Sequence, residues 1–199
     1  MCSDAGCKNQ HQYDHDDSPT YSAPSSPIEI TVEFGSGTLE GKLARDTLYL
    51  GDIAAPNIEF YEVTNQRGIF NEGEFDGIFG LSKPFDSQYG TQKSAFDVMV
   101  ERGIFAKNIF AFSLGRGSSS AYLTLGGYNQ DELASEIQWF KVIHPSYWMI
   151  ELDKVYLGDE DTKLCNNNCA AIIDSGTSLL TAPGTDLQVM TRKHFICLS

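Results

Sequence analysis

Short stretches in which apolar and polar residues alternate are the feature that most restricts the fold of this chain. Residues 28–33 alternate isoleucine or valine with glutamate or threonine, and Gly35-Ser36-Gly37 then interrupts the pattern. A period of two places successive side chains on opposite faces, as in a half-buried β-strand. Residues 38–50 form the returning strand of a predicted β-hairpin, and the glycines predict a mobile tip with positive φ angles.

The rest of the chain continues the same pattern of short strands. One helix is predicted over residues 94–102, with Ser94 as its N-cap and Gly103 beyond its end. Many strands with few helices predict an all-β sandwich or barrel. Further strands are predicted at residues 58–63, 109–114, 121–125, 137–142, 148–157 and 170–173.

Composition excludes several partner classes. The formal net charge of −13 repels nucleic acid and anionic lipid, so neither is expected as a partner. No apolar run approaches the eighteen residues that indicate a membrane-spanning helix. Met1 leads directly into polar residues, so no signal peptide is expected within this chain.

Five cysteines form two close pairs and one remainder. Four residues separate Cys2 from Cys7, three separate Cys165 from Cys169, and Cys197 stands alone. Such spacings can close short disulfide loops, which implies an oxidising compartment. A four-ligand zinc site is the alternative, but the pairs are far apart and neither is a C-x2-C pair. His11 and His15 lie in a polar segment and are expected to be solvated rather than to bind metal.

The strongest chemical signal is the segment 170–180. Two alanines and two isoleucines lead into Asp174-Ser175-Gly176-Thr177-Ser178, and Leu179 and Leu180 follow. Backbone N–H groups of the turn and the Thr177 hydroxyl can donate to the carboxylate and keep it ionised. A surface turn is the simpler interpretation of Asp, Ser and Gly. The apolar flanks, however, predict that Asp174 lies inside the protein, where an acid with arranged partners is a functional candidate.

Several separate motifs in the chain resemble one family. Asp174-Ser175-Gly176-Thr177-Ser178 resembles the catalytic signature of pepsin-like aspartic endopeptidases, in the form typical of the second lobe. The resemblance covers residues 2–187 and also includes the two cysteine pairs. The remaining matching motifs are Phe75-Asp76-Gly77-Ile78-Phe79-Gly80-Leu81, Leu125-Gly126-Gly127 and Tyr147-Trp148.

The resemblance implies an all-β, bilobal pepsin-like fold, present here in incomplete form. Residues 1–140 would be a partial N-terminal lobe with inter-lobe strands, 141–190 the start of the C-terminal lobe, and 191–199 an atypical tail. It also implies disulfides Cys2–Cys7 and Cys165–Cys169, with Cys197 free. No cofactor is implied, and a monomer is expected.

The resemblance also implies roles for individual residues. Asp174 would be one of two catalytic carboxylates that share a proton and activate water. Ser175 would brace the two active-site loops, and Thr177 would hold the outer oxygen of Asp174, with Gly176 and Ser178 completing the loop. The flap tip over the substrate would comprise Phe34, Gly35 and Ser36. The side-chain pockets would be lined by Phe70, Phe75, Ile78 and Tyr147, for which core packing is the alternative.

Two departures from the family pattern limit what the chain can do alone. No Asp-Thr-Gly or Asp-Ser-Gly precedes Asp174, so the first catalytic motif is expected upstream of Cys2. Phe34 stands where the flap usually carries a tyrosine, which removes a hydroxyl. The predicted function is aspartic endopeptidase action on peptide or protein substrates in the secretory pathway, extracellular or vacuolar/lysosomal, with this chain inactive by itself. The alternatives are a non-catalytic peptide- or protein-binding module with the same fold, and a chain that is not a natural product.

Overall fold

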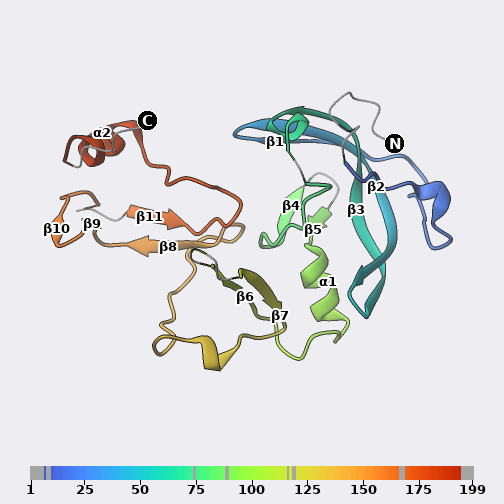
Figure 1. Ribbon diagram of the computed structural model, residues 1–199. Coiled ribbons are helices and arrows are strands. Elements are labelled where there is room, and N and C mark those ends of the chain that lie inside the picture. Colours follow the sequence, from blue (N-terminus) through green and yellow to red (C-terminus); the bar gives the residue numbers. More distant parts are fainter. Residues whose placement is uncertain are drawn as a thin grey trace. The chain divides into compact units, whose positions relative to one another are not determined.

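The computed structural model describes residues 7, 10–73, 75–87, 90–115, 117, 120–165 and 169–193. Strands dominate it, and the described part has only two α-helices (Figure 1), which confirms the predicted all-β class. The helices are α1 (Ala95–Glu101) and α2 (Gly184–Lys193), and single 3-10 turns are η2 (His15–Asp17), η3 (Ile69–Asn71) and η4 (Gln130–Glu132). The strands are β1 (Glu29–Phe34), β2 (Gly37–Leu50), β3 (Ile53–Gly68), β4 (Phe85–Ser87), β5 (Gly90–Gln92), β6 (Phe110–Ser113), β7 (Tyr122–Leu125), β8 (Met149–Leu152), β9 (Tyr156–Leu157), β10 (Glu160–Asp161) and β11 (Cys169–Ile172).

The chain forms two compact units, each described here by itself. Unit 1 comprises residues 1–81 and 93–130, and unit 2 comprises residues 82–92 and 131–199. These units are defined by compactness rather than by catalytic lobes. The predicted lobe boundary at residue 140 therefore stays a prediction.

Unit 1 is built on an antiparallel sheet in the order β1-β2-β3. The β1–β2 ladder runs from Glu29 opposite Lys42 to Phe34 opposite Gly37, so two residues, Gly35 and Ser36, form the turn. This confirms the predicted hairpin. Strand β3 extends well beyond the predicted 58–63, because its pairing with β2 continues to Gly68.

The hydrophobic core of unit 1 lies between this sheet and helix α1. Ala55 and Ile58 of β3 pack with Met99 of α1, and all three are buried. The helix begins as predicted: the Ser94 hydroxyl accepts from the Asp97 N–H, and the Asp97 side chain accepts from the Ser94 N–H. Burial against β3 adds to this cap, since a helix of seven residues is marginal alone.

Unit 2 consists of short strand pairs, β4–β5, β8–β11 and β9–β10. The predicted strand over 137–142 is wrong: only Val142 forms an isolated bridge, to Ile150. Trp139 and Phe140 are exposed, so their apolar side chains do not mark a buried strand face. The predicted strand over 148–157 is divided into β8 and β9, which pair with different partners.

A disulfide closes the loop that precedes β11. Cys165 and Cys169 are bonded with their Cα atoms 5.1 Å apart, within the usual range, which confirms this pairing. Cys7 is buried and also disulfide-bonded. Cys2 and Cys197 lie outside the described residues, so the pairing of Cys2 and the free thiol of Cys197 stay predictions.

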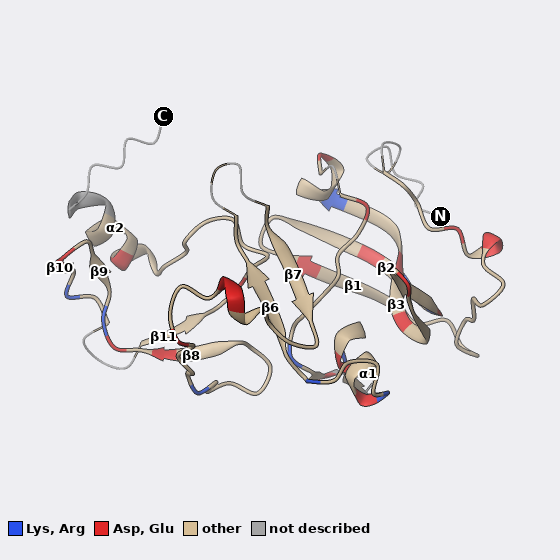
Figure 2. Cartoon of the chain, turned by 60° about the horizontal axis from the view of Figure 1, so that its bottom comes forward, with Lys and Arg blue, Asp and Glu red and all other residues tan. Residues whose placement is uncertain are grey.

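The acidic residues are distributed over both units. Figure 2 shows Asp and Glu, in red, on the long strands of unit 1, on α1 and on the short elements of unit 2. In the part of the chain that is described, no helix has both the length and the apolar character needed to cross a membrane.

Close backbone approach explains one glycine at the hairpin tip. Neither Gly35 nor Gly37 has a positive φ angle, contrary to the reason the sequence suggested. Instead, a Cβ atom on Gly37 would meet the Arg67 carbonyl oxygen and lie 2.8 Å from Cδ2 of Phe70. Gly68 opposite does have a positive φ of 72°, and the Ile69 N–H beside it donates to the Ser36 carbonyl over 3.0 Å. The tip is thus held against the end of β3.

Replacing Gly37 by alanine should therefore destabilise the protein. The added methyl group has no space beside Arg67 and Phe70, and overpacking of this kind costs about 1–3 kcal/mol. Urea unfolding should show a lower midpoint with an unchanged slope. Gly35→Ala is the matched control, because nothing lies within 4 Å of the atom it adds. Equal effects of the two substitutions would contradict this account.

Candidate active site

Asp174 stands directly after a strand that is fixed by its neighbour. Strand β11 pairs with β8 from Cys169 opposite Leu152 to Ile172 opposite Met149. One more hydrogen bond, from the Ile173 N–H to the Trp148 carbonyl over 2.9 Å, extends the pairing. The chain then turns, so the position of Asp174 is set by the end of this two-stranded ladder.

The turn holds both oxygens of the Asp174 carboxylate. The Thr177 hydroxyl donates to Oδ2 over 2.5 Å, and the Gly176 N–H donates to Oδ1 over 2.8 Å. These two donors, Thr177 foremost, hold the pKa of Asp174 below its ordinary value, against the opposing effect of partial desolvation. A Cβ atom on Gly176 would lie 3.2 Å from Oδ1, which favours glycine there. Ser175 and Ser178 are exposed, and their predicted supporting roles stay predictions.

The surroundings of Asp174 differ from the sequence expectation. Ile173 is 61% exposed and Leu180 is 89% exposed, so the prediction that apolar flanks place Asp174 inside is wrong for this structure. A two-stranded ladder presents two faces and cannot cover both. Asp174 itself is exposed, and its oriented carboxylate therefore remains accessible.

The predicted flap and pocket residues of unit 1 form a row of aromatic rings. The Phe34 ring at the hairpin tip lies edge-on to Phe70, with centroids 5.0 Å apart, and Phe70 lies edge-on to Phe75 at 6.0 Å. Phe70 is buried, whereas Phe34 and Phe75 are each about two-fifths exposed. Ile78 is also exposed. We call Phe34, Phe70 and Phe75 the aromatic row.

The remaining predicted pocket residue belongs to unit 2. Tyr147 packs against His144 with ring centroids 4.9 Å apart, and its own N–H donates to Nδ1 of that histidine over 3.2 Å. The structure thus brings together Phe34, Phe70 and Phe75 in one unit. Tyr147 and Asp174 lie in the other unit.

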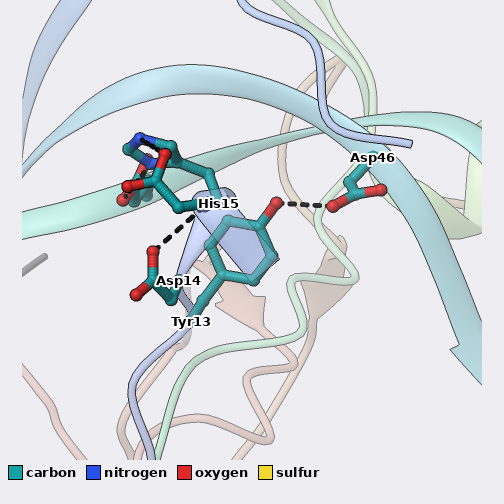
Figure 3. A network of polar contacts seen from close by, with 6 residues as sticks. Tyr13, Asp14, His15 and Asp46 are labelled. Atoms are coloured by element: carbon teal, nitrogen blue, oxygen red, sulfur yellow. Dashed lines mark hydrogen bonds and ion pairs between the residues drawn. The ribbon is translucent and has the colours of Figure 1, made fainter. Parts of the chain in front are cut away.

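A polar network that the sequence analysis missed anchors residues 10–22 to the sheet. Asp46 of β2 is only 7% exposed and accepts from Tyr13 over 2.5 Å, from the Thr47 N–H over 2.7 Å and from the Thr20 hydroxyl. Figure 3 shows the Tyr13 hydroxyl pointing at this carboxylate. Burial alone would raise the pKa of Asp46, but the hydroxyl and N–H donors outweigh it and hold the pKa well below its ordinary value.

His15 was expected to be solvated, and its side chain is 36% exposed, but it also makes a specific contact that the sequence did not predict. Its Nδ1 lies 3.0 Å from both carboxylate oxygens of Glu62, a residue of β3 that is 7% exposed. The ring also stacks on Tyr21 with centroids 4.7 Å apart. The hydrogen bond to Glu62 is the main reason why the pKa of His15 is raised. The partner, Glu62, is a charged residue in a later strand, and nothing in the sequence around His15 indicates the contact.

The described residues contain no cluster of three or more His, Cys, Asp or Glu side chains that could hold a metal ion. Fold and site together define a class: an all-β protein with an accessible carboxylate oriented by the hydroxyl and N–H groups of its own turn. Such a group is suited to accept a proton from water in acid–base catalysis.

Comparison with known proteins specifies this class further. Residues 1–194 match the family described as eukaryotic aspartyl protease. The chain belongs to this family, and its fold is an incomplete pepsin-like fold. It is 34% identical over 189 residues to cathepsin D of Gallus gallus, covering 93% of this chain and 46% of that protein. It is 34% identical over 184 residues to pepsin A of Sus scrofa (92% and 47%), and 31% identical over 188 residues to chymosin of Callithrix jacchus (94% and 48%). The chain therefore spans about half the length of these relatives.

Removing the Thr177 hydroxyl should raise the pKa of Asp174. Thr177→Val keeps the side-chain shape but removes the first of the two donors that stabilise the ionised form. Carbon-detected NMR titration of Asp174 would measure the pKa in each variant. Thr177→Ser retains a hydroxyl and serves as the control. An unchanged pKa in Thr177→Val would show that Gly176 alone sets the ionisation of this group.

The His15–Glu62 pair should make the stability of unit 1 depend on pH. Because the pKa of His15 is raised on folding, its contribution is fully present below the ordinary histidine pKa of about 6.5 and is lost as pH rises through the raised value. Wild type and His15→Ala would be compared by urea unfolding between about pH 5 and 9. The wild-type advantage should shrink with rising pH. In a Glu62→Gln background, NMR should show the pKa of His15 moving down, and no such movement would refute the pairing.

Proposed function

We propose that this chain is part of an aspartic-type endopeptidase and supplies Asp174 as one of its two catalytic carboxylates. The observation that carries the proposal is the Asp174 turn, where Thr177 and Gly176 orient an accessible carboxylate with a lowered pKa. The relatives named pepsin, cathepsin D and chymosin support the same assignment.

The reaction requires a second carboxylate close to the first. An ionised carboxylate takes a proton from water, whose oxygen attacks the scissile carbonyl carbon. A protonated carboxylic acid gives its proton to the carbonyl oxygen, and the tetrahedral intermediate then expels the amine with a proton from the pair. Two adjacent carboxylates share one proton because both cannot ionise at contact distance. The low pKa of Asp174 suits it to remain ionised.

The chain alone should lack this activity. Asp174-Ser175-Gly176 is its only Asp-Ser-Gly or Asp-Thr-Gly sequence. The partner carboxylate is therefore assigned to a part of the protein that this sequence does not include.

Substrate contacts are assigned to the hairpin tip, the aromatic row and two further side chains. Phe34, Gly35 and Ser36 would cover a bound peptide, with Ile78, Tyr147 and the aromatic row contacting its side chains. The substrates are peptides or proteins, with no nucleic acid involved, and the protein acts as a monomer.

The Cys165–Cys169 disulfide fits an oxidising compartment, as does a 32% identical relative named vacuolar aspartic protease from Candida albicans. We assign the protein to the secretory pathway, outside the cell or in a vacuole or lysosome.

A second candidate function follows from Phe34. Its ring packs on Phe70, and it offers no hydroxyl for a hydrogen bond to substrate or water. A non-catalytic module that binds peptides through the same surface would tolerate this substitution. The two functions differ in whether Asp174 is needed for turnover.

The test uses the complete coding sequence of the protein and the 199-residue chain in parallel. The complete product should contain a second Asp-Ser-Gly or Asp-Thr-Gly and cleave denatured globin at acidic pH. Asp174→Asn should lower that rate by at least about 10²-fold, the contribution expected of a general acid–base group. The 199-residue chain should show no cleavage beyond its own Asp174→Asn variant. Cleavage that survives Asp174→Asn in the complete product would contradict the catalytic assignment, and binding without cleavage would favour the module.

A further inference from the structure

We infer that Gln10 and Gln66 form an amide clamp that fixes Phe70 and Phe75 beneath the hairpin tip, as positioning residues for substrate selection. The clamp is built from two side-chain amides and three backbone carbonyls, all within unit 1. Its role in selection rests on the proposed function, in which the aromatic row contacts the peptide. The clamp itself rests only on contacts within the fold.

Gln66 is the buried half of the clamp. It lies on β3, is 5% exposed, and donates from Nε2 to the Phe70 carbonyl over 3.0 Å and to Oε1 of Gln10 over 3.1 Å. A buried amide without partners would be costly, so these two acceptors account for its place in the strand. Since β3 is paired along its length with β2, the position of Gln66 is fixed, and its hydrogen bonds hold the chain that follows β3.

Gln10 is the half that reaches from another segment. Its Oε1 accepts from Gln66, which leaves Nε2 directed at three backbone carbonyls: Phe75 over 2.9 Å, Gly73 over 3.3 Å and Phe70 over 3.4 Å. An amide turned the other way would place oxygen against oxygen at the three carbonyls and nitrogen against nitrogen at Gln66. The network therefore permits one orientation of this side chain.

Neighbouring contacts keep Gln10 in place. Its own N–H donates to the carbonyl of the disulfide-bonded Cys7 over 3.3 Å. The next residue, His11, contacts Asp76 twice, through its N–H to Oδ1 over 2.7 Å and through Nδ1 to Oδ2 over 3.1 Å. Asp76 directly follows Phe75. The residue after Gln10 is thus hydrogen-bonded to the residue after Phe75, which holds the two segments together beside the Gln10–Phe75 contact.

The clamp acts on the aromatic row through the backbone. Phe70 and Phe75 supply two of the three clamped carbonyls, and their rings form two of the three members of the row. Phe34 at the hairpin tip lies edge-on to Phe70 and therefore depends on the same anchor. Releasing the carbonyls frees both rings to move while the hairpin ladder and helix α1 stay intact. Neither glutamine needs to touch a peptide to change which side chain the surface accepts.

The decisive variant is Gln10→Glu, which has the same shape but opposite hydrogen-bonding capacity. Ionised, its carboxylate would face the three carbonyls as an acceptor and open the clamp. At pH below the ordinary glutamate pKa of about 4.3, the side chain is protonated and regains one donor. Hydrogen–deuterium exchange of the amides of residues 68–80 measures the opening. Protection at neutral pH should fall about tenfold or more, because three hydrogen bonds to the backbone of this segment are lost, and should recover at acidic pH.

Two alanine variants complete the experiment. Gln10→Ala should lose protection in residues 68–80 at both pH values, without recovery. Because this variant retains the His11–Asp76 contact, it also controls for any effect of pH on that contact. Gln12→Ala is the matched control, because that amide donates to the Cys7 carbonyl in the same segment but does not reach Phe70 or Phe75. Exchange in β1, β2 and α1 should stay at the wild-type level in all three. Unchanged protection of residues 68–80 in Gln10→Glu, or a loss without recovery at acidic pH, would overturn the clamp.

A second measurement separates the clamp from the proposed function. Binding of a fluorescein-labelled hexapeptide with a central phenylalanine is compared with that of its alanine counterpart. Wild type and Gln12→Ala should prefer the phenylalanine peptide, and Gln10→Ala should reduce that preference about tenfold, whereas a general loss of structure would weaken both peptides equally. If the wild-type chain prefers neither peptide, the assignment of the aromatic row to substrate contact and the role of the clamp in selection both fail. The exchange data still decide whether the clamp exists.

Discussion

From Gly37 to Lys42, strand β2 is hydrogen-bonded on both edges, to β1 on one side and β3 on the other, and β3 alone continues the pairing to Leu50. Unit 1 depends on this pairing. The fourteen residues of β2 place Gly37 at the hairpin tip, Asp46 under the strap of residues 10–22, and Leu48 and Leu50 against the core. Side chains of a strand keep fixed positions when both neighbours are in register. The pairing at Gly37 therefore determines where Phe34 meets Phe70, some thirty-six positions later in the sequence.

Two aspartates show how similar donors lead to different roles. Asp46 and Asp174 both accept from a threonine hydroxyl and a backbone N–H, and in both the pKa is lowered. Asp46 accepts in addition from Tyr13 and is buried, so its oxygens are occupied and closed to solvent. Asp174 is exposed and has lone pairs that its two donors leave unused. The first arrangement holds a strap on a sheet, whereas the second leaves a carboxylate able to exchange protons.

The sequence was most informative where structure is set by nearby residues. The alternation before Gly35, the Ser94 N-cap and the Asp174 turn with a backbone N–H and Thr177 are all local, and each formed as predicted. Contacts between distant residues left no such mark. Glutamine at positions 10 and 66 looks like an ordinary polar residue until the fold brings the two together. The aromatic residues at 139 and 140 misled in the opposite way, because apolar character alone does not supply a strand partner.

The strap of residues 10–22 has a consequence for how the chain folds. The β1–β2 and β2–β3 hairpins close over two-residue turns, whereas Tyr13 meets Asp46 across 33 positions and Gln10 meets Phe75 across 65. Closing a longer loop costs more chain entropy, so short-range pairing precedes long-range docking. The sheet should therefore form first and the strap dock onto it afterwards. Until it docks, Glu62 of β3 lacks its His15 contact, Gln66 lacks its Gln10 contact, and the Phe60 ring lacks Tyr13. That interval is when the nascent chain is most exposed to aggregation through its aromatic residues.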